Sequence, residues 1–288
     1  MAQVGPDNDL ATELTGITFV QDRQADAVHR GRMTDTSRAF VELSGFRFRL
    51  WPLVLAALLM EGLLRAGREL ARWIYLANET AWDGHVSVFL LMAILFQALF
   101  GLAAILVMRR LLPEADDHLR MPPGKSYVGL AFLIGVGMGL VMLIADYWPA
   151  LLSRTPPSPS YLVTTFDAVG YLLGMLTTGL TEETIFRGLL VGMLVVLVPG
   201  RLRIGRLDLP VAAYAVALMF GLAHLQSFVV DPLHQAIAQQ LYAFAWGLIY
   251  VWLMERSRSL LAPMIAHGLG NFTEVAIVIA LNAAWQPV

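Results

Sequence analysis

Two adjacent acidic residues, Glu182 and Glu183, lie with Arg187 in a stretch of the chain that is apolar enough to lie in a lipid bilayer. An ionisable side chain in the hydrocarbon costs at least about 2.5 kcal/mol on insertion scales, so three of them within one short segment must be paired, hydrated or both. Ionisable residues at membrane depth mark functional sites by default. This segment is therefore the first place to look for chemistry.

The spacing of these three residues assigns them different partners. Successive residues of a helix point about 100° apart, so Glu182 and Glu183 cannot aim at one point, whereas residues four apart share a face. We expect Glu183 to pair with Arg187, with the acid in the favourable N-terminal position. A purely structural ion pair explains these two residues as well as a catalytic role does. Glu182 remains on the neighbouring face with Phe186 and is free to face a cavity.

Two later apolar segments carry polar residues that would be partners for Glu182. His224 follows Phe220 by one helical turn, and Asn271 follows His267 by one turn. Glu274 lies on the face of His267 and Asn271, and we interpret it as a chance position near a helix end rather than as a supporting hydrogen-bonding group. Small residues would let these helices approach closely, namely Gly221, Gly268 and Gly270.

A carboxylate, two histidines and an asparagine around one water molecule can hydrolyse an amide without a covalent intermediate. Glu182 would take a proton from a water that His224 also holds, and this water would attack the scissile carbonyl. His267 and Asn271 would donate hydrogen bonds to the developing oxyanion, each worth about 3 to 4 kcal/mol in a site of low dielectric constant.

A zinc site is the alternative interpretation of the same residues. Glu182, His224 and His267 would bind the metal if they converge, with Glu183 as a fourth ligand. The spacing is unlike His-Glu-x-x-His, the arrangement of zinc proteases, so we favour a site without a metal or other cofactor. The chain has no cysteine, which excludes thiolate ligands and a thiol nucleophile.

Three ordered motifs resemble the CPBP family of intramembrane proteases, which includes type II CAAX prenyl endopeptidases and bacteriocin-processing or immunity-associated proteins. They are Glu-Glu-x-x-x-Arg at 182–187, Phe-x-x-x-His at 220–224 and His-x-x-x-Asn at 267–271, and the resemblance extends over about 162–281. It implies a glutamate-type protease with Glu182 as the base, His224 as its partner on the water, and His267 with Asn271 as the oxyanion site. Glu183, Arg187 and Phe220 carry over as supporting residues.

The composition explains which elements must hold these residues. Hydrophobic residues make up 57% of the 288 residues and mean hydropathy is +0.63, values that are typical of a polytopic membrane protein. A net charge of −2 predicts no affinity for nucleic acid.

Seven apolar runs are candidates for membrane spans, and they predict an all-α transmembrane helical bundle. They lie at 50–64, 86–108, 127–148, 162–198, 209–228, 237–254 and 260–285. The first is short, and the fourth is too long for one straight span, so we expect it to be tilted or broken, which would make eight spans. We expect solvent near the span ends to surround Glu61, Asp146, Asp167 and His234.

We divide the chain into a flexible polar tail at 1–46, transmembrane helices at 47–160 and a catalytic helical core at 161–288. Arginine and lysine gather in the tail and in alternate loops, which predicts a cytoplasmic N-terminus and an external C-terminus. Arg65, Arg68 and Arg72 are the exception, and we assign them to a short amphipathic helix on the membrane surface. The arginine-rich, lysine-poor composition favours the cytoplasmic membrane of a prokaryote.

One geometric difficulty follows from these spans. His224 lies about 22 Å past the cytoplasmic start of its span, whereas His267 lies only about 10 Å past the start of its own. Tilt, or a span that begins late, must close this difference if the two histidines are to meet.

The sequence as a whole predicts an intramembrane endopeptidase that cleaves a membrane protein or a lipidated peptide, near its C-terminus, within the lipid bilayer. A non-catalytic membrane scaffold or immunity protein of the same fold is the alternative. A proton-coupled transporter would also use buried ionisable residues, but the chain shows no internal repeat with broken helices in corresponding positions.

Overall fold

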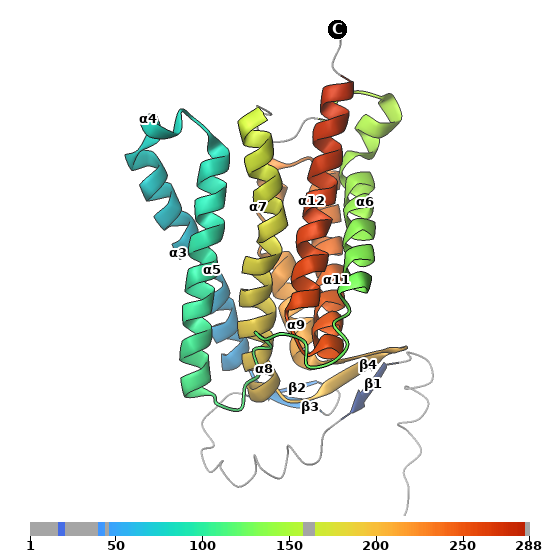
Figure 1. Ribbon diagram of the computed structural model, residues 1–288. Helices are drawn as coiled ribbons and strands as arrows, with labels where there is room; N and C mark the ends of the chain where they lie inside the picture. Colours follow the sequence, from blue (N-terminus) through green and yellow to red (C-terminus); the bar gives the residue numbers. More distant parts are fainter. Residues whose placement is uncertain (1–16, 21–39, 44–45, 158–164, 286–288) are drawn as a thin grey trace, which may run out of the picture.

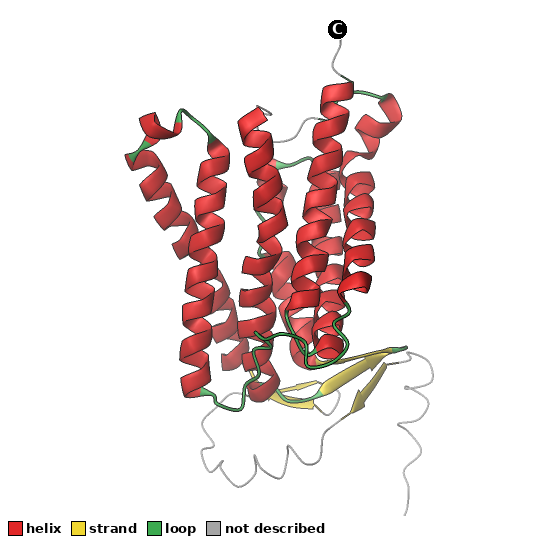
Figure 2. Cartoon of the chain, in the orientation of Figure 1, coloured by secondary structure: helices red, strands yellow, loops and turns green. Residues whose placement is uncertain are grey.

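The computed structural model describes residues 17–20, 40–43, 46–157 and 165–285. Long helices stand side by side as a bundle, and small strands lie together at one end of it (Figure 1). Colouring by secondary structure shows that helices make up nearly all of the described chain (Figure 2). The predicted class, an all-α membrane bundle, is confirmed.

Each of the seven predicted runs corresponds to helix in the structure. The helices are α3 (Trp51–Ala77), α4 (Glu79–Trp82), α5 (Val86–Leu111), α6 (Val128–Ser153), α7 (Thr165–Glu183), the π-helix η1 (Thr184–Val191), α8 (Gly192–Leu197), α9 (Val211–Leu222), α10 (Ser227–Val230), α11 (Leu233–Ser257) and α12 (Leu261–Ala284). Five stretches in the described residues are long and apolar enough to cross a membrane: Val86–Leu111, Val128–Ser153, Val211–Val230, Leu233–Ser257 and Leu261–Ala284.

The first helix is longer than its apolar run. α3 continues to Ala77, so the predicted end at residue 64 and the separate surface helix are both wrong. Ion pairs at helical spacing line its exposed continuation, with Arg65 2.7 Å from Glu61 and Arg72 3.8 Å from Glu69. Such pairs support a helix beyond its apolar part.

The fourth run is one continuous helical rod whose winding changes in the middle. α7 ends at Glu183, η1 follows directly, and α8 completes the rod, so the described residues contain no eighth span from a break here. All eight residues of η1 are buried. A π-helix widens the turn by one residue and is found mostly at functional sites. The winding therefore changes immediately after the acidic pair.

Two small sheets were not predicted. β4 (Arg201–Ile204) and β5 (Leu207–Pro210) form a hairpin, and β1 (Ile17–Val20) pairs antiparallel with β4. β2 (Phe40–Leu43) pairs with β3 (Phe46–Arg49). β1, β2 and the first residue of β3 fall within the segment that we expected to be a flexible tail, and the rest of that tail lies outside the described residues. Gly205 supplies the positive φ of 59° in the β4–β5 turn.

Close contact between α7 and α12 depends on two glycines. A Cβ on Gly268 would lie 2.2 Å from the backbone oxygen of Leu176, and a Cβ on Gly179 would lie 2.4 Å from that of Met264. No side chain fits at such distances, so the two backbones touch. This crossing sets the distance between the acidic pair of α7 and His267 of α12.

The other glycines singled out in the sequence matter less. The nearest atoms to a Cβ on Gly270 or Gly221 would be 3.5 and 3.6 Å away, which is ordinary contact. The prediction of a close approach is confirmed for Gly268. It is also confirmed for Gly270 through its backbone oxygen, which would lie 2.6 Å from a Cβ on Gly139 of α6, whereas the contact at Gly221 is ordinary. Two glycines of α6 that the sequence analysis did not name, Gly135 and Gly139, allow these backbone contacts with α12, at Ala266 and Gly270.

Candidate active site

A cavity of about 250 Å³ inside the bundle brings the predicted residues together. Glu182 of α7, Phe220 of α9 and His267 of α12 line it, as do His224 and Asn271. The five residues come from three separate helical segments, so only the tertiary fold unites them. Glu183 and Arg187 lie fully buried behind the wall.

Glu183 is the centre of a hydrogen-bonded triad. Its Oε1 accepts a hydrogen bond from Arg187 Nη1 at 3.0 Å and another from His267 Nδ1 at 2.8 Å. The predicted pairing of Glu183 with Arg187 is therefore confirmed. Because an ionised carboxylate only accepts, Nδ1 carries a proton and Nε2 is the ring nitrogen on the side of Glu182, 3.8 Å from Glu182 Oε2.

Aromatic rings replace solvent around Arg187. Its guanidinium carbon lies 4.6 Å from the ring centre of Phe220, 5.0 Å from that of Tyr250 and 5.7 Å from that of Phe186. The electron-rich faces of these rings stabilise a cation that is completely buried. A Cβ on Gly247 would lie 3.2 Å from Arg187 Nη2, so this glycine makes room for the guanidinium.

Phe220 and Tyr250 also fix the orientation of the histidine rings. Phe220 meets His224 and His267 edge to face, with ring centres 5.1 and 5.7 Å apart. Tyr250 stacks on His267 at 5.0 Å with an angle of 13° between the rings. Rotation of the His267 ring is thus restricted on both sides as well as by Glu183.

Tyr250 belongs to a face of α11 that the sequence analysis missed. Gln239, Tyr242, Trp246 and Tyr250 all line the cavity and recur at offsets of three, seven and eleven residues. This spacing places them on one helical face. A polar and aromatic stripe along an otherwise apolar span was the signal that could have identified them.

His224 lies just past the end of α9 rather than within it. Its Nδ1 donates a hydrogen bond to the backbone oxygen of Phe220 at 2.7 Å, and its own backbone oxygen accepts one from Gln240 at 3.2 Å. Since a carbonyl oxygen can only accept, the proton is on Nδ1 and the lone pair of the neutral ring is on Nε2.

A late start of α12 resolves the difference in depth between the two histidines. The backbone N–H of Val211, where α9 begins, donates to the oxygen of Gly200, beyond the end of the rod formed by α7, η1 and α8. Leu260, the residue before α12, lies beside Gly188 of the same rod. Gly188 precedes Gly200 by about a dozen residues, so α12 begins at a deeper level of the rod than α9 does. α12 thus begins well inside the bundle.

Two acidic residues that we expected in solvent are buried. Asp146 is 9% exposed and accepts a hydrogen bond from Tyr242 at 3.0 Å. Asp167 is 6% exposed and binds His85 and the backbone N–H of Ser87. Both predictions of solvation are wrong, because helix packing covers these positions.

The position of Glu274 also differs from the chance placement near a helix end. Glu274 lines the cavity and lies beside Asp146. Glu274 therefore belongs to the wall of the cavity, and its role as a hydrogen-bonding group stays a prediction.

The residues do not fit the zinc alternative. The described part of the chain has no group of three or more His, Asp or Glu residues that could hold a metal ion. Glu183, the expected fourth ligand, already binds Arg187 and His267 through Oε1. Metal independence stays a prediction for experiment.

The fold and the cavity define an integral membrane protein with an ionisable site inside its helical bundle. Residues 164–273 match a family model described as type II CAAX prenyl endopeptidase Rce1-like. The matched segment contains all the candidate residues from Glu182 to Asn271, so the predicted resemblance is confirmed over this part of the chain. No curated protein and no solved structure matches the chain.

Proposed function

We propose that this protein is an intramembrane endopeptidase that hydrolyses a peptide bond of a membrane-associated substrate through a water activated by Glu182. The observation that carries the proposal is the single cavity shared by Glu182, His224, His267 and Asn271. The family match adds support, because that family is described by a peptidase activity.

Glu182 and His224 act on the water. The water donates one hydrogen to the Glu182 carboxylate and the other to His224 Nε2, so that its oxygen lone pairs are left for attack on the carbonyl carbon. As the new carbon–oxygen bond forms, Glu182 takes up the proton. It then delivers this proton to the departing amine when the carbon–nitrogen bond breaks.

His267 and Asn271 stabilise the charge that develops on the carbonyl oxygen. Glu183 fixes His267 through Nδ1, so the Nε2 side of the ring faces the cavity and would donate when it carries a proton, and the Asn271 amide supplies a second donor. Donors that are already oriented in a site of low dielectric constant are worth about 3 to 4 kcal/mol each. Glu183, Arg187 and Phe220 are positioning residues in this mechanism.

The substrate class that we propose is a membrane protein or a lipidated peptide, cleaved near its C-terminus. The description of the matched family names prenyl substrates, and a membrane-embedded cavity suits a peptide that a lipid or a helix holds at the bilayer. We further propose that the protein lies in a prokaryotic cytoplasmic membrane with its N-terminus in the cytoplasm, in line with the arginine-rich loops.

The test is to compare the C-termini of membrane proteins by mass spectrometry in cells that carry the wild-type chain or Glu182→Gln. We expect shortened C-termini in the wild type and a loss of cleavage of about 10² to 10⁴-fold in the variant, the range for removing a general base. Glu61→Gln, an exposed glutamate of α3, is the matched control and should cleave normally.

Two outcomes would contradict the proposal. Cleavage that persists in Glu182→Gln would refute the assignment of the base. Identical C-termini in the wild type and in cells that lack the chain would refute proteolysis and favour a scaffold of the same fold.

A further inference from the structure

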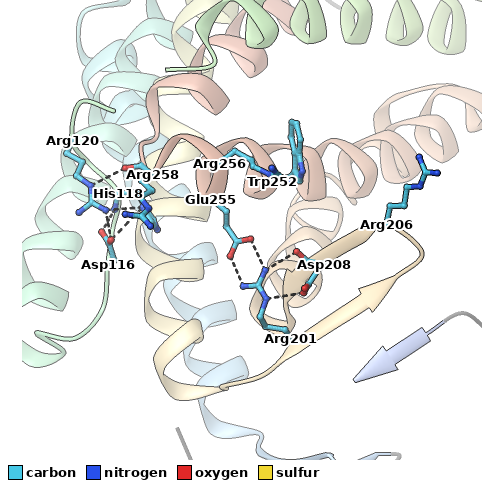
Figure 3. A pocket seen from close by; sticks show the side chains of 10 residues that line it. All are labelled: Asp116, His118, Arg120, Arg201, Arg206, Asp208, Trp252, Glu255, Arg256 and Arg258. Carbon is cyan, nitrogen blue, oxygen red and sulfur yellow. Dashed lines mark hydrogen bonds and ion pairs between the residues drawn. The ribbon is translucent and has the colours of Figure 1, made fainter. Parts of the chain in front are cut away.

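A second cavity, of about 580 Å³, lies at the end of the bundle that carries the sheets, and it shares no lining residue with the candidate active site. The loop between α5 and α6, the β4–β5 hairpin and the end of α11 form its walls (Figure 3). Five arginines and three carboxylates line it, so its wall carries an excess of positive charge.

Two of these arginines are neutralised by the carboxylates. Arg201 binds Glu255 at 2.9 Å and Asp208 at 3.0 Å, and these two acids hold the pKa of Arg201 above its ordinary value. Arg120 binds Asp116 at 2.6 Å. All three carboxylates of the wall are therefore already paired.

Three arginines have no carboxylate partner among the described residues. Arg206 lies in the β4–β5 turn, Arg256 near the end of α11 and Arg258 just beyond it, and all three are exposed. Arg256 lies over the ring of Trp252 at 5.5 Å, an arrangement that leaves its donors available. Figure 3 shows no ion pair at Arg206 or Arg256, whereas it shows the pairs at Arg201.

The position of the cavity along the bundle indicates where its ligand comes from. α11 ends at Ser257, and the other walls come from the β4–β5 hairpin and the α5–α6 loop, which lie outside the apolar spans. Tryptophan prefers the level of the lipid headgroups, and Trp252 lies in this wall. Basic pockets between helices at this level suit anionic headgroups.

We propose that this cavity is a binding site for a phosphate-bearing anion, held by the free guanidiniums of Arg206, Arg256 and Arg258. Guanidinium groups bind phosphate through paired hydrogen bonds and keep their charge at all physiological pH values. The same chemistry serves the headgroup of an anionic lipid or a soluble phosphate, and the site is independent of the proposed peptidase activity.

The test uses the full chain in phosphatidylcholine nanodiscs and measures binding by isothermal titration calorimetry. The probes are dioctanoyl phosphatidic acid, dioctanoyl phosphatidylcholine and inorganic phosphate. We expect the phosphatidic acid or the inorganic phosphate to bind, the phosphatidylcholine not to bind, and R206Q/R256Q/R258Q to weaken the binding at least about tenfold. The three side chains are exposed, so the variant should fold, and tryptophan fluorescence and gel filtration check this.

The matched control is R65Q/R68Q/R72Q, which removes the same charge from exposed positions of α3 and should bind like the wild type. Tighter binding of the phosphatidic acid, without competition by inorganic phosphate, identifies a lipid. Equal binding of inorganic phosphate identifies a soluble anion. An equal loss of affinity in both triple variants, no loss in R206Q/R256Q/R258Q, or no binding of either phosphate probe overturns the proposal.

Discussion

Gly268→Ala should strongly reduce activity without altering any group that touches the substrate. The added Cβ would lie 2.2 Å from the backbone oxygen of Leu176, which falls 1.2 Å short of the 3.4 Å at which ordinary contact begins. The added Cβ and the Leu176 oxygen both belong to helix backbones and cannot rotate apart as flexible side chains can. The helices α7 and α12 must therefore move apart. Overpacking of this kind costs about 1 to 3 kcal/mol of stability.

The catalytic effect follows from the hydrogen bond between the two helices. His267, the residue before Gly268, donates from Nδ1 to Glu183 Oε1 at 2.8 Å, and a separation of roughly 1 Å takes this pair beyond hydrogen-bonding distance. A misplacement of that size in an active site can cost about 10²-fold in rate. We expect a loss of about 10²-fold in kcat with the protein still folded.

Gly270→Ala is the matched control for this experiment. It lies two residues further along α12 and gains the same helix propensity, but its Cβ would be 3.5 Å from the nearest atoms. The assay is cleavage of a reporter peptide by purified protein in proteoliposomes, together with thermal unfolding of both variants. Equal activity of Gly268→Ala and Gly270→Ala would refute the claim that this backbone contact sets the active-site geometry.

Three further predictions concern other parts of the structure. Glu183→Gln should lower the free energy of unfolding by about 3 to 5 kcal/mol, because it leaves the buried charge of Arg187 uncompensated, and denaturant titration would show little change if the pair were unimportant. Exhaustive chelation of the purified protein should leave cleavage of the reporter peptide intact, and activity restored only by added zinc would contradict the mechanism. Burial by itself would raise the pKa of Asp117. Hydrogen bonds from the Arg109 guanidinium, at 2.6 Å, and from the backbone N–H of Leu119 outweigh burial, so the pKa lies below its ordinary value of 3.8. A carboxyl group with a lowered pKa stabilises the fold above pH 3.8, where it is ionised. Asp117→Asn should therefore be less stable than the wild type at pH 7, and this difference should shrink as the pH falls below about 4. Thermal unfolding of both proteins over this pH range measures the difference.

The pairing of Glu183 with Arg187 could be predicted from the sequence because it is local. Both residues lie on one helical segment, and spacing alone puts them on the same face. The seven helical runs were predictable for the same kind of reason, since a bilayer requires long apolar stretches. The end of α3 was missed because exposed ion pairs, rather than apolar residues, continue that helix.

The burial of Asp146 could not be predicted in this way. It depends on Tyr242, which lies about one hundred residues away in the sequence. The role of Tyr250 was also missed, because its stacking on His267 joins two helices whose register no local pattern fixes.

The amino-acid sequence by itself determined the membrane-embedded helical class and the short-range motifs at Glu182, His224 and His267, since apolar length and helical spacing are properties of neighbouring residues. Only the tertiary structure decided that these motifs share one cavity. The physical reason is the backbone contact at Gly268 and the late start of α12 beside Gly188, which bring distant segments to the same depth. The same packing places around a second cavity, at the end of the bundle, three arginines that have no carboxylate partner in the described part of the chain.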